Sequence, residues 1–488
     1  MSLDNLPQPS VHSGPKPMSY FVVPLIVGCA LFMEMLDSTV IVTALPAMAR
    51  SLHENPITLN LAITAYLMSL GVFIPISGWV ADRFGARKVF RCAIVLFTLG
   101  SMLCGMSQSL PELVVFRVMQ GFGGAMMTPV GRLVVLRSVQ KADLVQAMSY
   151  LTVPSMLGPV VGPPVGGFIV TYYSWRWIFY INVPICILGL ILVTLFIDDL
   201  PPTVVPRLDI RGFLLTGVGL AGLSFGFETV GRGVVAPWLI GLAMAAGLLL
   251  TALYVRHARR VKDPIVSLAL LAIPTFQAAN TGGSLFRMGM GAMPFLLALL
   301  LQIAFGLSPF LSGLLIFANA SGAFLMKFSV HPVVRAFGFR PVLIVNGLLS
   351  AISIGVCALF TSTTPHSVIA VVLLLGGFFQ SLQFTSLNAL CYADVPSRLT
   401  SHASTFATMA QQLSFSFGVA LAAMILHLGL SLHGRTVLSV HEIAPALLLI
   451  SLLPLVAVLL FVPLAADAGH EVSGRRQPAV LETAASLE

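Results

Sequence analysis

Long apolar stretches follow one another along the whole chain, and short polar connections separate them. Each stretch is close to the roughly 20 residues that a helix needs to cross the hydrocarbon core of a bilayer. Because lipid offers no partners to backbone N–H and C=O groups, such segments are expected to be helical. The pattern predicts fourteen membrane-spanning helices, at residues 20–46, 57–80, 89–107, 111–136, 146–171, 177–197, 210–230, 237–256, 274–303, 309–331, 340–360, 366–391, 402–430 and 443–465.

The order of the spans indicates two similar halves. Six spans precede Asp198, six follow Pro274, and two lie between these residues. Paired halves with a binding site between them are a common plan among transporters. We therefore expect an all-α polytopic membrane protein in five parts: a disordered cytoplasmic N-terminus at 1–19, a six-helix bundle at 20–197, an inserted two-helix hairpin with its linkers at 198–273, a second six-helix bundle at 274–465, and a cytoplasmic tail at 466–488.

The composition agrees with a membrane protein. Only 9% of the 488 residues are charged, and 57% are hydrophobic. A soluble domain carries about 25% charged residues, so this chain cannot cover a surface that faces water. The six cysteines lie in or near the spans without a Cys-x-x-Cys spacing, so we expect buried thiols and neither disulfides nor metal ligands.

Basic residues are distributed unequally between the two sets of connections. Of the 26 lysines and arginines, 18 fall on the side of the chain ends, 4 on the opposite side and 4 within spans. Since basic residues favour the cytoplasmic side, both termini are expected in the cytoplasm. The net charge of +8 then reflects topology and attraction to anionic lipid, and no nucleic-acid partner is expected.

A charged turn, GWVADRFGARK, joins spans two and three at residues 78–88. It resembles the signature loop of the major facilitator superfamily, which implies the major facilitator fold and a secondary transporter. By this resemblance Asp82 faces the N-terminus of span thirteen, near Ser401, and latches one conformation; simple topology is the alternative. The equivalent segment of the second half, 334–340, keeps a glycine and arginines but lacks the acid. The expected latch residues are Gly78, Asp82, Arg83, Gly85 and Arg87.

Ionisable residues are embedded in spans one and four. Arg117 lies several residues inside an apolar helix, where a charge costs at least about 2.5–3.5 kcal/mol, so it must face a wet cavity or a partner. Glu34 and Asp37 are three residues apart on one helix face. Burial and mutual repulsion favour the protonated form of at least one of them, which can then exchange a proton near neutral pH. A buried hydrogen-bonded hub is the structural alternative for each residue.

Span five combines glycines and prolines in the run GPVVGPPVGG at residues 158–167. Glycines four residues apart form one smooth helix face that allows close packing, and prolines bend the helix. In the superfamily this pattern marks exporters that exchange substrate for protons; ordinary packing of small residues is the alternative. The expected antiporter seam consists of Gly158, Pro159, Gly162, Pro163 and Gly166.

The sequence Leu-Asp-Ser-Thr followed by Ala-Leu-Pro, within residues 36–46, resembles the first helix of the fourteen-span drug:proton antiporters of the EmrB/QacA type. Asp37 matches this motif, whereas Glu34 lies outside it. The run WRWIFYINVP at 175–184 also matches that family, and here we favour interfacial anchoring and a kink at Pro184. The resemblance implies a multidrug exporter of the bacterial inner membrane that is coupled to protons without another cofactor. The expected coupling residues are Asp37 and Arg117, with Glu34 as an auxiliary acid because of its place in the span, and we expect a monomer.

The second half contains embedded cations without an accompanying acid. Arg287 lies near the middle of span nine, and Lys327 near the end of span ten can extend its amine to the interface. A carboxylate metabolite or a metal chelate is therefore an alternative cargo to a cationic drug. The candidate cargo contacts are Arg287, Gln120 and Gln411.

Other classes of protein find less support. The chain contains no Gly-Lys-Ser/Thr triplet for a nucleotide phosphate and no second histidine at zinc spacing near His53 or His441, so neither an ATP-driven pump nor a metalloprotease is indicated. No enzymatic activity is expected. A membrane sensor that binds ligand without moving it is the remaining alternative.

Overall fold

A computed structural model describes residues 19–138, 144–198, 208–229, 236–261, 264–327, 329–396, 399–434 and 437–469. All regular elements within these ranges are helices, which confirms the expected all-α class. The segment expected to be disordered, 1–19, lies outside the described residues except for Ser19, and so does most of the expected tail at 466–488.

The helices of the first half correspond to the first six predicted spans. Span six is divided in two by a break at Ile181. The elements are α1 (Ser19–Leu52), α2 (Asn60–Phe84), α3 (Ala86–Met106), α4 (Leu110–Ser138), α5 (Leu144–Tyr172), α6 (Trp177–Tyr180) and α7 (Asn182–Phe196).

The remaining helices follow the predicted hairpin and second bundle. The elements are α8 (Ile210–Thr229), α9 (Pro237–Ala258), η3 (Leu268–Ala272), α10 (Pro274–Leu299), η4 (Leu300–Ala304), α11 (Pro309–Met326), α12 (Val330–Phe337), α13 (Phe339–Val356), η5 (Cys357–Leu359), α14 (His366–Ala393), α15 (Thr400–His433) and α16 (Val440–Phe461). In the described part of the chain, 13 helices are long and apolar enough to cross a membrane. Helix α5, with 29 residues, matches the remaining predicted span.

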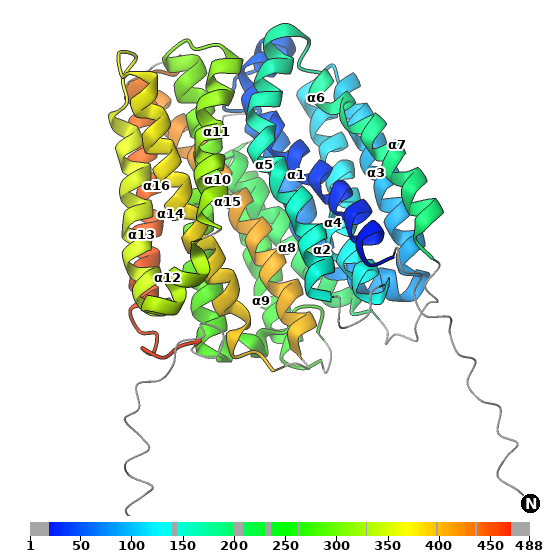
Figure 1. The fold of residues 1–488 in the computed structure, drawn as a ribbon. Coiled ribbons are helices and arrows are strands. Elements are labelled where there is room, and N and C mark those ends of the chain that lie inside the picture. Colours follow the sequence, from blue (N-terminus) through cyan, green and yellow to red (C-terminus); the bar gives the residue numbers. More distant parts are fainter. Residues whose placement is uncertain are drawn as a thin grey trace, which may run out of the picture.

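The two bundles lie side by side, with the N-terminal bundle in blue to blue-green and the C-terminal bundle in green (α10 and α11) through yellow to red (Figure 1). Helix α2 packs along α15, and hairpin helix α8 contacts both of them where the bundles meet. We call the side on which α1 begins and α16 ends the terminal side, and the opposite side the far side. Since successive helices alternate in direction, the α2–α3 turn lies on the terminal side and the α1–α2 turn on the far side.

The bundles share one hydrophobic core on the far side, where buried residues from α1, α10 and α15 belong to a single cluster. Hydrogen bonds also cross between the bundles here, from Gln302 Nε2 to Thr43 O at 3.0 Å and from the Phe310 amide to Thr171 Oγ1 at 3.1 Å. On the terminal side, each bundle has its own core. The two halves are therefore joined at the far side, and at the terminal side each also has a core of its own. A smaller buried cluster, with residues from α2, α9 and α15, connects the halves through the hairpin.

The glycines of α5 face α1 within the first bundle. A Cβ atom on Gly158 would lie 2.9 Å from the Leu36 amide nitrogen, and Cβ atoms on Gly162 and Gly166 would meet Thr39 and Thr43. Contact with the other bundle occurs through α11, where a Cβ atom on Gly313 would meet the Pro163 carbonyl. The glycine face thus packs on a helix of its own half, and contact with the opposite half occurs near Pro163.

Asp209 ties the terminal-side ends of the hairpin together. Its Oδ1 accepts the Gly212 amide of α8 at 2.8 Å and lies 2.8 Å from His257 Nε2 on α9. The linker after α9 is held by Tyr254, whose hydroxyl donates to Val266 O at 2.7 Å. The hairpin is therefore closed at the end from which the chain enters the second bundle.

Four cysteines are buried as expected, namely Cys104, Cys186, Cys357 and Cys391. The expectation was wrong for Cys29 and Cys92, which are exposed on the protein surface. An apolar span has an outward side as well as an inward one, and its hydrophobicity alone does not distinguish them.

Gly158→Ala should lower the melting temperature of the purified protein, because the added Cβ would lie 2.9 Å from the backbone of both Phe32 and Leu36. Overpacking of this kind costs about 1–3 kcal/mol. The matched control is Gly189→Ala on α7, where nothing lies within 4 Å of the added Cβ. Thermal unfolding in one detergent compares them, and equal melting temperatures would contradict the close α1–α5 packing.

Candidate functional site

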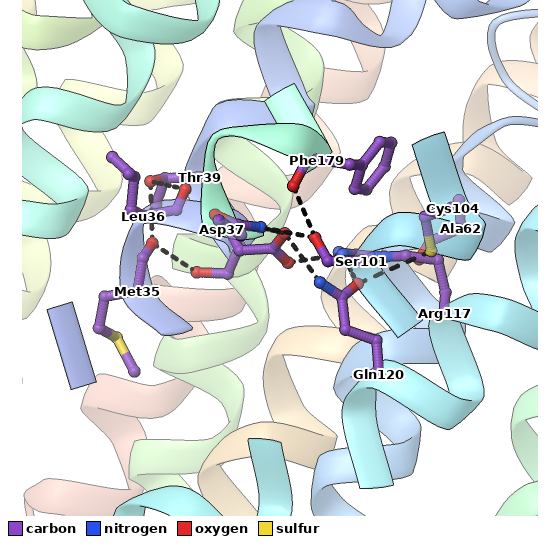
Figure 2. A network of polar contacts seen from close by, with 12 residues as sticks. Met35, Leu36, Asp37, Thr39, Ala62, Ser101, Cys104, Arg117, Gln120 and Phe179 are labelled. Carbon is purple, nitrogen blue, oxygen red and sulfur yellow. Dashed lines mark hydrogen bonds and ion pairs between the residues drawn. The ribbon is translucent and has the colours of Figure 1, made fainter. Parts of the chain in front are cut away.

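A polar network with Asp37 at its centre lies inside the first bundle (Figure 2). The Asp37 carboxylate accepts three hydrogen bonds from two helices. Arg117 Nη1 lies 2.6 Å from Oδ2, while Gln120 Nε2 at 3.0 Å and Asn182 Nδ2 at 2.6 Å both donate to Oδ1. These four side chains are at most 2% exposed. The ion pair is thus removed from solvent, and each carboxylate oxygen has at least one donor.

Helical spacing explains why α4 contributes two of the donors. Arg117 and Gln120 are three residues apart and share one helix face. Their side chains are also joined, since Arg117 Nη1 donates to Gln120 Oε1 at 2.7 Å. Gly121 lies on the same helix, and a Cβ atom there would be 2.8 Å from the Tyr66 carbonyl of α2, so a glycine permits the close approach of α4 and α2.

The Arg117 guanidinium has further partners inside the bundle. Its Nε donates to Ala62 O at 3.2 Å, and its Cζ lies 4.3 Å from the centroid of the Tyr66 ring. Nη2 and the Tyr66 hydroxyl are both buried without a hydrogen-bond partner among the described residues. A buried ion pair is stabilising only when its remaining polar atoms are well satisfied. The network is consequently well bonded on its Asp37 side and incompletely bonded on its Tyr66 side.

Glu34 has a partner of its own. Thr128 Oγ1 of α4 donates to Glu34 Oε2 at 2.8 Å, and Glu34 is 2% exposed. Thr128 lies closer than Gln120 to the terminal-side end of α4, as Glu34 lies closer than Asp37 to the terminal-side end of α1. The two acids therefore occupy successive positions along the α1–α4 contact: Asp37 is ion-paired, and Glu34 is bonded to a hydroxyl group.

The predicted latch residues lie around the α2–α3 turn. Gly85 has φ of 93°, which favours glycine, and Arg87 Nη2 donates to Thr194 O of α7. Asp82 is half-buried, Arg83 is exposed, and no atom lies within 4 Å of a Cβ atom built on Gly78. The equivalent turn between α12 and α13 contains Gly338 with φ of 81°. The two halves thus repeat the same glycine turn.

The three candidate cargo contacts do not form one group. Gln120 belongs to the Asp37 network, whereas Arg287 bonds within the second bundle, to Ala279 O at 3.3 Å and Asn388 Oδ1 at 3.1 Å. Arg287 is 1% exposed, and its Nε has no hydrogen-bond partner among the described residues. Gln411 is half-buried on α15. The buried cation of the second half is therefore bonded to neutral oxygens.

Asn182 is the member of the network that the sequence analysis did not select. It lies in the segment 175–184, for which an interfacial role was favoured, and it is the first residue of α7 after the break at Ile181. An asparagine two residues before a proline, inside a very apolar span, is the signal that could have identified it. Only the packing of α7 against α1 shows which acid it reaches.

Comparisons with known proteins establish the family. The chain matches the Major Facilitator Superfamily over residues 27–419, which is more than half of its length. It therefore belongs to this superfamily of membrane transporters, as expected from its motifs. It is 39% identical over 404 residues to a protein of Salmonella paratyphi B that is named for multidrug resistance, MdtD, covering 82% of this chain and 85% of that protein. The MdtD of Salmonella typhimurium is also 39% identical, over 406 residues.

Solved structures agree on the fold. A D-xylose–proton symporter aligns with a TM-score of 0.65 at 15% identity, covering 92% of this chain and 99% of that one. A bacterial homologue of the lysosomal transporter Spinster, in an inward-facing conformation, aligns with a TM-score of 0.61 at 14% identity, covering 95% of this chain and 100% of that one. The chain is thus a multi-pass membrane transporter of the major facilitator fold.

Removing one partner of the Asp37–Arg117 pair should destabilise the protein more than removing both. Arg117→Met leaves a buried carboxylate without its cation, which costs roughly 3–5 kcal/mol, whereas apolar replacement of a whole buried pair is often neutral. The double variant Arg117→Met, Asp37→Leu should recover most of the melting temperature lost in Arg117→Met. A double variant less stable than the single one would show that the two side chains act independently.

Proposed function

We propose that this chain is a proton-coupled exporter that exchanges small molecules for protons by alternating access, in the inner membrane of a bacterium and with both termini in the cytoplasm. The observation that carries the proposal is the buried, ion-paired Asp37, because its charge can be cancelled by a single proton. The excess of basic residues on the terminal side supports the orientation. The multidrug-resistance name of the relatives supports drug:proton antiport of the EmrB/QacA type.

Asp37 is the proposed proton carrier. Its ionised form is stabilised by Arg117 at 2.6 Å and by two amide donors. A proton on Asp37 removes the attraction to Arg117, so the protonated and ionised forms favour different arrangements of α1 and α4. A ligand or proton shifts a conformational equilibrium only through such a difference in interaction energy. Glu34 is an auxiliary acid, located nearer the terminal side and bonded to Thr128.

The separate terminal-side cores correspond to a state open to the cytoplasm in the proposed orientation. Changing access requires the shared far-side core to separate, together with the bonds from Gln302 to Thr43 and from Phe310 to Thr171. The close packing of α5 on α1 makes these two helices move together, and contact with α11 near Pro163 is where α5 meets the opposite half. The turn with Asp82, Arg83 and Arg87 is the proposed latch.

The driving force is adequate for export. One charge moving through about 150 mV supplies about 3.5 kcal/mol. This free energy supports roughly a 300-fold concentration ratio of cargo if one charge moves in each cycle.

A carboxylate metabolite or a metal chelate is the second candidate cargo. Arg287 supports it, because this buried cation bonds only to the neutral oxygens of Ala279 and Asn388 among the described residues. The exporter is proposed to act as a monomer in lipid, with protons as the coupling ion and no other cofactor.

Asp37→Asn should abolish uphill transport while cargo still exchanges down its gradient, because an amide cannot exchange the coupling proton. Glu34→Gln should slow transport without abolishing it, since the acid that pairs with Arg117 remains. The measurement uses purified protein in liposomes with an imposed pH step and a panel of lipophilic cations and aryl carboxylates. Undiminished uphill transport by the double variant Asp37→Asn, Glu34→Gln would refute proton coupling through these acids.

Arg287→Ala should reduce the affinity for carboxylates more than that for cations if the cargo is an anion. Its matched control is Lys327→Ala, which removes a second-half cation bonded to Thr385 at 2.7 Å. Equilibrium binding and pH-driven transport are measured for both variants. Equal losses of carboxylate binding and proton release in Arg287→Ala would count against an anion site.

A further inference from the structure

We propose that Asn182 positions the proton carrier Asp37. Asn182 donates a hydrogen bond to the ionised carboxylate of Asp37 and accepts one from its protonated form. The inference rests on the proposed function and assigns this role to a residue outside the expected coupling set. The Asn182 amide has two N–H donors and one acceptor oxygen.

Both donors of the amide are used, and its acceptor is not. Nδ2 donates to Asp37 Oδ1 at 2.6 Å and to Ser101 Oγ at 2.8 Å. Oδ1 is buried and has no hydrogen-bond partner among the described residues. Leaving a buried acceptor unsatisfied costs about 1–3 kcal/mol. Asn182 thus has an unused acceptor in immediate reach of the group that gains a proton.

The other two side chains that donate to Asp37 cannot change from donor to acceptor as easily. Arg117 carries donors only. Gln120 has an acceptor, but its Oε1 already receives Arg117 Nη1 at 2.7 Å, so rotation of that amide would turn its N–H groups toward the guanidinium. Rotation of the Asn182 amide by half a turn would instead present Oδ1 to the new O–H of Asp37. The Ser101 hydroxyl, which now donates to Phe179 O at 2.9 Å, can turn to the same Oδ1.

The backbone around Asn182 suits this role. Pro184 lacks an N–H group, so the carbonyl of Tyr180 has no donor from that position and the helix is interrupted between α6 and α7. Asn182 follows the break directly, and Ser101 of α3 holds the amide on the other side. The amide is therefore held between Asp37 of α1 and Ser101 of α3, and a half-turn of its plane would exchange the donor for the acceptor at this position.

Other ionisable groups around Asp37 lie on five of the helices that pack in this region. Glu34 is on α1, Tyr66 on α2, Cys104 on α3, Arg117 on α4 and Cys186 on α7, and the charge of Asp37 acts on each of them. From α5 the described ionisable groups are Tyr150 and Tyr172 near its ends, from α6 Tyr180, and from α10 Arg287, which bonds within its own bundle. The variants below leave all these groups in place.

The test is a pH titration of Asp37 that needs no cargo. The protonated-carboxyl band in the infrared spectrum of the full chain in lipid nanodiscs is followed with pH and assigned to Asp37 by its loss in Asp37→Asn. Asn182→Leu should move the midpoint of this band to higher pH by about one unit or more, because a hydrogen bond to a charged group is stronger than one to a neutral group. The band should also move to the frequency of a less hydrogen-bonded carboxyl group.

Ser101→Ala is a second variant that keeps the test decisive if Asn182→Leu does not fold. It removes the other partner of the amide and should move the midpoint in the same direction by less. Asn346→Leu is the matched control, a buried asparagine of the second bundle bonded to Phe379 O at 2.6 Å and Gln383 Oε1 at 3.2 Å, and it should leave the midpoint unchanged.

Three results would overturn the inference. The first is a midpoint and band frequency in Asn182→Leu that equal those of the wild type. If Asn182→Leu does not fold, the same result in Ser101→Ala overturns the inference. An equal midpoint shift in Asn346→Leu would assign the effect to general loosening of the protein. If no carboxyl band of the wild-type chain depends on Asp37, the proton-carrier role itself fails, which separates failure of the proposed function from failure of this inference.

Discussion

The burial of the Arg117 guanidinium is the constraint on which the first bundle depends. A charge without solvent access must find an opposite charge and several hydrogen bonds, or the helix that carries it is not stable in the membrane. Asp37 supplies the charge, and Ala62, Gln120 and the Tyr66 ring supply further contacts. The proposed coupling uses the same arrangement, because a proton on Asp37 would remove the ion pair with Arg117.

The two bundles share their architecture and differ in their chemistry. Each has a glycine with positive φ at equivalent turns, Gly85 and Gly338. Each also has a buried arginine, but Arg117 pairs with an acid, whereas Arg287 bonds to a carbonyl and an amide oxygen. In the proposed mechanism protons are exchanged in the first half, while the second half keeps a positive charge without an acid among its hydrogen-bond partners. An exchanger needs one site for the proton and one for the cargo, and the two halves differ in this way.

The fold could be predicted from the sequence to a large extent, because span length and helicity follow from the thickness of the bilayer and from backbone hydrogen bonding. Asp37, Glu34 and Arg117 could be selected because buried charges are costly. Their partners could not be predicted, since these depend on how each helix is rotated. Thr128 lies beside Glu34, and Gln120 lies beside Asp37, apart from the other two cargo candidates, Arg287 and Gln411. Asn182 was missed for the same reason, and Cys29 and Cys92 show that hydrophobicity alone does not tell which side of a span faces outward.

The most direct test of the account measures whether a proton on Asp37 moves the two halves. Spin labels are placed at the exposed residues Phe84 and Phe337, on the terminal side of the first and second bundles, after the exposed Cys29 and Cys92 are replaced by serine. Double electron–electron resonance in nanodiscs gives the distribution of distances between the two labels as a function of pH. Acidification should redistribute the distances in the parent protein and not in Asp37→Asn. The same pH response in both proteins would contradict it.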